Sequence, residues 1–99
     1  MIVEGKSEYK VPGGKMVRTY LAVKDRIIVN VKIAGDFFMY PEETLVELEN
    51  YLKGKRIDEG ELSKIIENFL RERNIKLLGV TAQDFAKAIQ MAFDRMNLD

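Results

Sequence analysis

Apolar and polar residues alternate along the first third of the chain, which is typical of β-strands with one buried face. The alternation predicts two good strands, over residues 16–23 and 27–34, and a weaker strand over residues 6–11 that Pro12 ends. The segment between the two good strands is short enough for a hairpin, and Asp25 tolerates a left-handed turn position. The predicted buried faces are Val17, Thr19, Leu21 and Val23 in the first of these strands, and Ile27, Val29, Val31 and Ile33 in the second.

From Pro41 onward the apolar period lengthens to that of a helix. Pro41 suits the first helical position, and the two glutamates that follow it suit the positive end of the helix dipole. Gly54 is a residue that commonly closes a helix. The pattern therefore predicts a first helix that begins at Pro41 and ends near Gly54.

Two pairs of polar residues mark the starts of two further helices. Asp58 with Glu61, and Thr81 with Asp84, have the spacing of capping boxes. Asn74 is the expected end of the second helix. The predicted buried stripes of the three helices are Leu45, Leu48 and Leu52; Leu62, Ile65, Ile66, Phe69 and Leu70; and Phe85, Ala88, Ile89, Ala92, Phe93 and Met96.

Strands come first and helices follow, which is the order of an α+β domain. We expect a three-stranded antiparallel sheet followed by three helices packed on one face. The chain has 99 residues and no linker-like, repeated or low-complexity segment, so residues 1–99 are expected to form one domain.

The composition excludes several kinds of chemistry. Sixteen basic side chains balance sixteen acidic ones, which argues against nucleic acid or an anionic membrane as the main partner. The sequence has neither cysteine nor histidine, so disulfides, thiolate metal sites, cysteine nucleophiles and imidazole bases are absent. The N-terminal residues are too charged for a signal peptide, and no apolar run is long enough to span a bilayer. A cytoplasmic protein is the expectation.

The stretch KVPGGKMVR places Gly13 and Gly14 before Lys15 and Arg18. A P-loop needs a Gly-Lys-Ser/Thr end that opens a helix, whereas here a methionine follows the lysine and a strand is predicted next. Backbone amides of a glycine turn, with Lys15 and Arg18, are able to meet an anion. The alternative, which Pro-Gly pairs favour, is that the glycines only turn the chain into the next strand.

Acidic residues between positions 34 and 43 are candidates for acid/base or metal chemistry: Asp36, Glu42 and Glu43. Glu42 and Glu43 are neighbours on a predicted helix, so their side chains point about 100° apart. The nearby sequence supplies no further ligands, and stabilisation of the helix dipole explains both glutamates. The other helix charges, among them Glu47, Glu49, Glu67, Arg71, Arg73, Lys87 and Arg95, are expected to form an ordinary solvated surface.

Four large side chains follow one another in the same segment: Phe37, Phe38, Met39 and Tyr40. In an extended chain they cannot all face one core, because neighbouring side chains point to opposite sides. Some must then be exposed or covered by a partner, and aromatic residues are common anchors of interfaces. A protein interface and a packed corner of the fold both remain open at this point.

These two stretches together resemble a known family. YKVPGGKMVR, followed by a hairpin and VKIAGDFFMYPEETLVELENYLKG, resembles the C-terminal accessory domain of lipoate–protein ligases from Tyr9 through the last helix. In many bacteria this domain follows the catalytic domain in one chain, and in some archaea it is a separate small subunit. The hairpin residues Lys24, Asp25 and Arg26 depart from a family pattern that often has glycine there, which we expect to alter only the turn.

The resemblance implies a function that depends on a second chain. The catalytic half of the family binds lipoate, ATP and magnesium, forms lipoyl-adenylate and passes lipoyl to a lysine of an acceptor lipoyl domain. Its arginine- and glycine-rich lipoate motif is absent here, which implies a cofactor-free accessory subunit in a heterodimer that assists adenylate formation. The alternative is a non-catalytic adaptor that binds a lipoyl or acyl-carrier domain. The residues expected to contact the partner subunit or substrate are Gly13, Gly14, Lys15, Arg18, Asp36, Phe37, Phe38 and Tyr40.

The accessory domain is also similar in architecture to the iron–sulfur scaffold and sulfur-acceptor family. The stretch GKRIDEGEL, residues 54–62, looks like a part of those scaffolds. They hold a cluster or sulfur on cysteines, and this sequence has none, which excludes cluster assembly.

Overall fold

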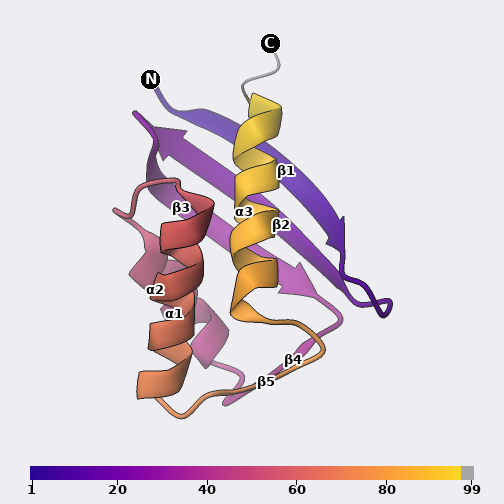
Figure 1. Cartoon of the computed structure of the whole chain (residues 1–99). Coiled ribbons are helices and arrows are strands. Elements are labelled where there is room, and N and C mark those ends of the chain that lie inside the picture. The colour runs from indigo at the N-terminus through magenta and orange to yellow at the C-terminus, as the bar shows by residue number, and fades with distance from the viewer. Residues whose placement is uncertain (97–99) are drawn as a thin grey trace.

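The computed structural model describes residues 1–96, in which a three-stranded antiparallel sheet is covered by three helices (Figure 1). This arrangement confirms the α+β fold class. A second sheet of two short antiparallel strands, Phe38–Tyr40 and Lys76–Leu78, was not predicted. In chain order, the elements are β1 (Val3–Lys10), β2 (Met16–Lys24), β3 (Ile27–Gly35), β4 (Phe38–Tyr40), α1 (Thr44–Leu52), α2 (Glu59–Glu72), β5 (Lys76–Leu78) and α3 (Ala82–Met96).

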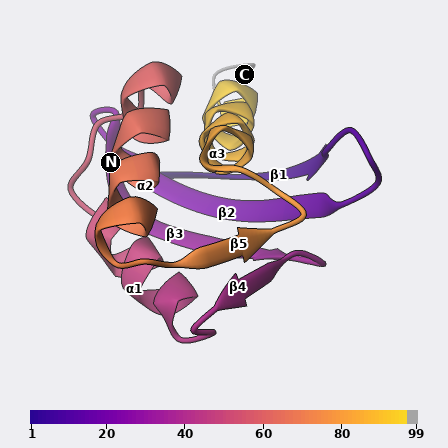
Figure 2. The ribbon, with the colours of Figure 1, turned by 60° about the horizontal axis from the view of Figure 1, so that its bottom comes forward.

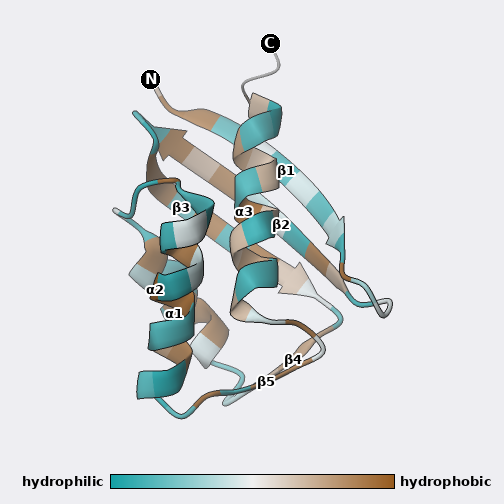
Figure 3. Ribbon diagram, in the orientation of Figure 1, coloured by the Kyte–Doolittle hydropathy of each residue, from teal (hydrophilic) through white to brown (hydrophobic). Residues whose placement is uncertain are grey.

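The helices form a layer on one face of the sheet. α3 lies on β1 and β2, α1 lies on β3, and α2 packs against α3. Hydrophilic residues dominate the sides of α2 and α3 that face the viewer in Figure 3, and hydrophobic residues recur on the strands behind them. Figure 2 shows β4 and β5 side by side on the side of the sheet away from β1.

The core lies between the two layers and contains most of the predicted stripes. Burial of such stripes is the main source of stability for helices of this length. Leu45, Ile65, Leu70 and Met96 are only partly buried at its margin. The predicted residues that are buried are Val17, Thr19, Leu21, Val23, Val31, Ile33, Leu48, Leu52, Leu62, Ile66, Phe69, Phe85, Ala88, Ile89, Ala92 and Phe93.

The second and third helices begin at the predicted caps. The Asp58 carboxylate accepts a hydrogen bond from the Glu61 N–H at 3.1 Å. The Thr81 N–H donates to Asp84 Oδ2 at 2.8 Å, and the Asp84 N–H donates back to Thr81 Oγ1 at 3.3 Å. Asn74 follows α2 with a φ of 53°. These capping predictions are confirmed.

The first helix begins later than predicted. α1 starts at Thr44, and the Thr44 N–H donates to the Pro41 carbonyl at 3.1 Å, so residues 41–43 form a turn before the helix. Pro41 follows a cis peptide bond with Tyr40. The expected end is confirmed, because Gly54 follows α1 with a φ of 88°.

A β-bulge in β3 changes which side chains face the core. Ala22 pairs with Asn30 and Val23 pairs with Ile28, so Val29 is an extra residue with no partner of its own. One extra residue exchanges the two faces on one side of the bulge. Ile28 is therefore 1% exposed and Val29 39% exposed, so the predicted burial of Val29 is wrong. The other predicted members of this face are Ile27, which is half-buried, and Val31 and Ile33, which are buried.

The β2–β3 hairpin turns as predicted. Lys24 pairs with Ile27, so the loop consists of Asp25 and Arg26, with φ values of 52° and 65°. Positive φ at both positions is the geometry of a tight type I′ turn, which Asp25 and Arg26 adopt here without a glycine.

Glu49 is buried, contrary to the expectation of a solvated helix charge. Its Oε2 accepts a hydrogen bond from the Ile33 N–H at 2.7 Å, and its Oε1 lies 3.9 Å from Lys32 Nζ. Because β3 is an edge strand, its outer N–H groups lack a neighbouring strand. The Glu49 carboxylate thus supplies the acceptor that a neighbouring strand would supply for the buried Ile33 N–H.

Candidate functional site

Three segments that are distant in the sequence meet at one end of the molecule. The β1–β2 turn brings Lys15, the β3–β4 connection with β4 brings Asp36 and Phe38, and the turn before α3 brings Gly79. Asp36 Oδ1 accepts a hydrogen bond from the Met16 N–H at 2.7 Å, and Lys15 Nζ lies 5.8 Å from the centre of the Phe38 ring. The Lys15 side chain also lies against Gly79, in the turn before α3. We call Lys15, Asp36, Phe38, Tyr40 and Gly79 the Lys15 cluster.

The glycine stretch forms the tight β1–β2 turn. The Val11 N–H donates to the Lys15 carbonyl at 2.7 Å, and the Gly14 N–H donates to the Val11 carbonyl at 3.0 Å. Gly13 and Gly14 have φ values of 104° and 103°, which residues with a Cβ rarely adopt. The turn interpretation of the two glycines is confirmed, and it also explains how Lys15 reaches β4. Anion binding by this turn stays a prediction.

Asp36 ties the end of β3 to the start of β2. The hydrogen bond from the Met16 N–H, and then the positive charges of Lys15 and Arg18, hold the pKa of the Asp36 carboxyl below its ordinary value. The neighbouring Gly35 allows the two strands to approach, because a Cβ there would lie 2.1 Å from the Met16 carbonyl oxygen. Asp36 therefore stabilises the position of the β1–β2 turn as a charged carboxylate.

The aromatic run divides between core and surface. Met39 is buried, and the Phe37 ring packs edge-to-face on Phe85 with 5.1 Å between ring centres. Phe38 and Tyr40 are 53% and 47% exposed, and their rings stack 6.5 Å apart and nearly parallel. The alternation of β4 explains this division. The segment thus packs into the core through Phe37 and Met39 and presents Phe38 and Tyr40 as an exposed aromatic pair.

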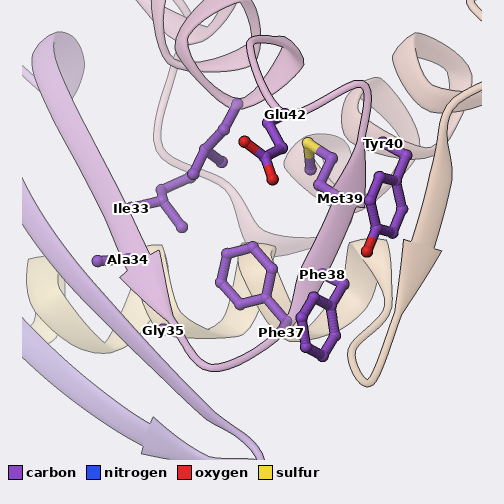
Figure 4. A pocket seen from close by; sticks show the side chains of 9 residues that line it. Ile33, Ala34, Gly35, Phe37, Phe38, Met39, Tyr40 and Glu42 are labelled. Atoms are coloured by element: carbon purple, nitrogen blue, oxygen red, sulfur yellow. The ribbon is translucent and has the colours of Figure 1, made fainter.

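A hollow lies between the end of β3 and β4, with the Phe37 ring inside it and the Glu42 carboxylate at its rim (Figure 4). Its volume is about 340 Å³, at the small end of the range of ligand pockets. Phe38 and Tyr40 lie side by side on the opposite side from Ile33 in this view. The hollow is lined by Ile33, Ala34, Gly35, Phe37, Phe38, Met39, Tyr40, Glu42 and Leu45.

Arg18 lies apart from the cluster. Its neighbours Val17 and Thr19 face the core, so its side chain points from the opposite face of the sheet. There Arg18 Nε lies 3.0 Å from Glu8 Oε2. The structure therefore brings Lys15, Asp36, Phe38 and Tyr40 together, and it places the Arg18 guanidinium in an exposed ion pair.

Residues 5–89 match the family model described as the bacterial lipoate protein ligase C-terminus. The chain belongs to this family. It is 32% identical over 76 residues to "Lipoate-protein ligase A subunit 2" of Thermoplasma acidophilum, covering 77% of this chain and 78% of the relative. It also matches a chain in the structure of an archaeal lipoylation system, a bi-partite lipoate protein ligase and its E2 lipoyl domain from Thermoplasma acidophilum. That match has a TM-score of 0.77 and 29% identity, and it covers 90% of this chain and 97% of the other.

Sequence reasoning missed one member of the Lys15 cluster in this ligase C-terminal domain. Gly79 has a φ of 94° and lies two residues before the cap Thr81, where a glycine is easily taken for an ordinary turn residue. Its contact with Lys15 joins residues 64 positions apart in the sequence, and no local pattern reports such a contact.

Two further findings concern residues 1–96. No group of three or more acidic side chains in this range is placed to hold a metal ion. No helix in the same range is long and apolar enough to cross a membrane.

Proposed function

We propose that this chain is the accessory subunit of a two-chain lipoate–protein ligase. It docks on a separate catalytic subunit and enables the ATP-dependent activation of lipoate to lipoyl-adenylate, before lipoyl is transferred to a lysine of a lipoyl domain. The observation that carries the proposal is the relationship to a protein named as subunit 2 of such a ligase, over most of both chains. The lack of histidine and cysteine agrees with a subunit that assists a reaction instead of performing it alone.

The activation step sets the task of an accessory subunit. It joins a carboxylate to a polyphosphate, so it depends on positioning and on neutralisation of negative charge. In the proposal the catalytic subunit binds ATP, lipoate and magnesium, and this chain binds none of them by itself. Lys15 is the residue of this chain suited to the task, because its ammonium group is presented beside exposed aromatic rings.

We assign the docking surface to the end of the molecule that carries the Lys15 cluster. Phe38 and Tyr40 form a stacked, half-exposed pair, and aromatic side chains of this kind are common anchors of protein interfaces. Gly13 and Gly14 shape the turn that holds Lys15 beside them, and Asp36 fixes the base of that turn. Phe37 anchors the start of this segment on Phe85 in the core, and we keep Arg18, on the other sheet face, as a predicted contact outside the cluster.

A measurement of pyrophosphate release tests this function. The catalytic subunit, lipoate and ATP are mixed with and without this chain, and the proposal requires that release depends on the chain. The second candidate, an adaptor for lipoyl or acyl-carrier domains, predicts binding to such a domain with no effect on pyrophosphate release.

The proposal includes three finer points. Residues 1–99 act as one accessory domain, and the working location is the cytoplasm, which the absence of cysteine favours. The likeness in architecture to iron–sulfur scaffolds and sulfur acceptors stays a prediction. It brings no cluster chemistry to this chain, because the sequence has no cysteine to hold one.

A further inference from the structure

We infer that Gly79 is a positioning residue that holds Lys15 in place for the proposed activation step. The inference rests on the proposed function for its consequence, but its structural part concerns this chain alone. It assigns a role to the turn between β5 and α3, which is distant in the sequence from both motifs that resemble the family.

The missing side chain of Gly79 leaves a space that the Lys15 side chain fills. A Cβ on Gly79 would lie 3.1 Å from Lys15 Cγ, 3.3 Å from Cε and 3.5 Å from Cδ. The whole aliphatic stem of Lys15 therefore runs along the backbone of Gly79. The two shorter distances are tighter than ordinary van der Waals contact, so a methyl group on Gly79 would push the Lys15 stem by a few tenths of an ångström, and a larger side chain would push it further.

The same turn also sets the position of the ring beside Lys15. Leu78, immediately before Gly79, pairs with Phe38 across the two-stranded sheet. Thr81, two residues after Gly79, begins α3 through its capping box with Asp84. Gly79 thus lies between β5, which pairs with the strand that carries Phe38, and a helix anchored in the core. The Lys15 stem packs against the turn that joins these two elements.

This arrangement leaves the charge of Lys15 available. Among the described residues, no carboxylate forms an ion pair with Lys15, and its ammonium group lies near the Phe38 ring. A lysine side chain has several rotatable bonds, and their freedom must be lost when the side chain binds a partner. Contact with Gly79 orders the stem beforehand, so less freedom is lost when Lys15 meets an anionic group in the complex.

The chain offers a matched control for backbone effects. Gly79 and Gly54 have φ values of 94° and 88°, and a Cβ on Gly54 meets nothing within 4 Å. Gly54 donates its N–H to the Ile28 carbonyl, at the opposite end of β3 from the Lys15 cluster. Asparagine tolerates positive φ better than most residues. Gly79→Asn and Gly54→Asn therefore share the backbone strain, and only Gly79→Asn displaces Lys15.

The first measurement is NMR of the isolated chain. We expect nuclear Overhauser contacts between the Gly79 Hα protons and the Lys15 CγH₂ and CεH₂ protons. The Lys15 methylene shifts should change in Gly79→Asn and should stay unchanged in Gly54→Asn. Absence of these contacts in the parent chain, or unchanged Lys15 shifts in Gly79→Asn, overturns the inference whether or not the chain assists a ligase.

The second measurement is a double-mutant cycle on the complex. Gly79→Asn and Lys15→Ala should each weaken the dependence of pyrophosphate release on this chain by about tenfold, and the double variant should be no weaker than Lys15→Ala alone. Independent, multiplying losses would show that Gly79 acts through another route and would overturn its positioning role. If the parent chain has no effect on release, the proposed function fails and the inferred role in activation fails with it, while the NMR result separately decides the contact.

Discussion

Phe37 and Phe38 are neighbours in the sequence, but their replacement should have opposite consequences. Phe37 packs edge-to-face on Phe85, which is fully buried, whereas Phe38 is 53% exposed. The Phe38 ring stacks on the half-exposed Tyr40 ring and lies 5.8 Å from the Lys15 ammonium group. We therefore expect Phe37→Ala to affect folding and Phe38→Ala to affect binding.

The expected magnitudes follow from these contacts. Complete removal of a buried phenylalanine costs several kcal/mol, and Phe37 is partly buried, so Phe37→Ala should lower the free energy of unfolding by about 2–3 kcal/mol. Phe38→Ala removes one exposed stacking contact and one exposed cation–π contact, which should change the same free energy by less than about 1 kcal/mol. As an interface anchor, Phe38 should contribute about 2 kcal/mol to binding, or a ~30-fold change in Kd.

Two assays separate the effects. Urea unfolding followed by circular dichroism reports the free energy of unfolding, and calorimetric titration of the catalytic subunit reports Kd. The proposed docking surface would be refuted if Phe38→Ala bound the catalytic subunit as tightly as the parent chain. Equal destabilisation by both variants would instead refute the division of the aromatic run between core and surface.

Two further predictions concern carboxylates that bond backbone N–H groups. Glu49→Ala leaves the buried Ile33 N–H without an acceptor, so it should lower the free energy of unfolding in urea by about 1–3 kcal/mol. Glu49→Gln keeps an acceptor oxygen and should lower this free energy less. An equal loss in both variants would contradict this role of Glu49. Folding lowers the pKa of the Asp36 carboxyl, so the charged carboxylate stabilises the folded chain. This stabilisation is complete above the ordinary carboxyl pKa of about 4, and it is lost as the pH falls through the lower pKa of the folded chain. Asp36→Asn should therefore reduce the decline of the urea midpoint with falling pH in this acidic range, and an unchanged pH profile would count against the bond to Met16 as its cause.

Local sequence patterns predicted much of the fold, because local contacts determine those features. The caps at Asp58 and Thr81 bond residues three positions away, so their spacing alone predicts the helix starts. The bulge at Val29 could not be predicted in this way, because it depends on the register between two strands. The same holds for Glu49, whose burial depends on the edge of β3 and not on its own helix.

The candidate site was predicted only in part for the same reason. Lys15 and Phe38 belong to recognisable motifs, and the structure brings them together. The predicted buried face of β2 already implied that Arg18 points to the opposite face of the sheet, and the burial of Val17 and Thr19 confirms it. The sequence could not show that β5 pairs with β4 and so places Gly79 against Lys15, since this pairing closes a long loop.

The most direct test of the central claim is a titration of the catalytic subunit with this chain, in the presence of lipoate and ATP, with pyrophosphate release as the readout. An accessory subunit predicts that the rate rises from a low value and saturates at one chain per catalytic subunit. A rate that is already maximal without the chain, and that stays constant throughout the titration, would contradict the claim.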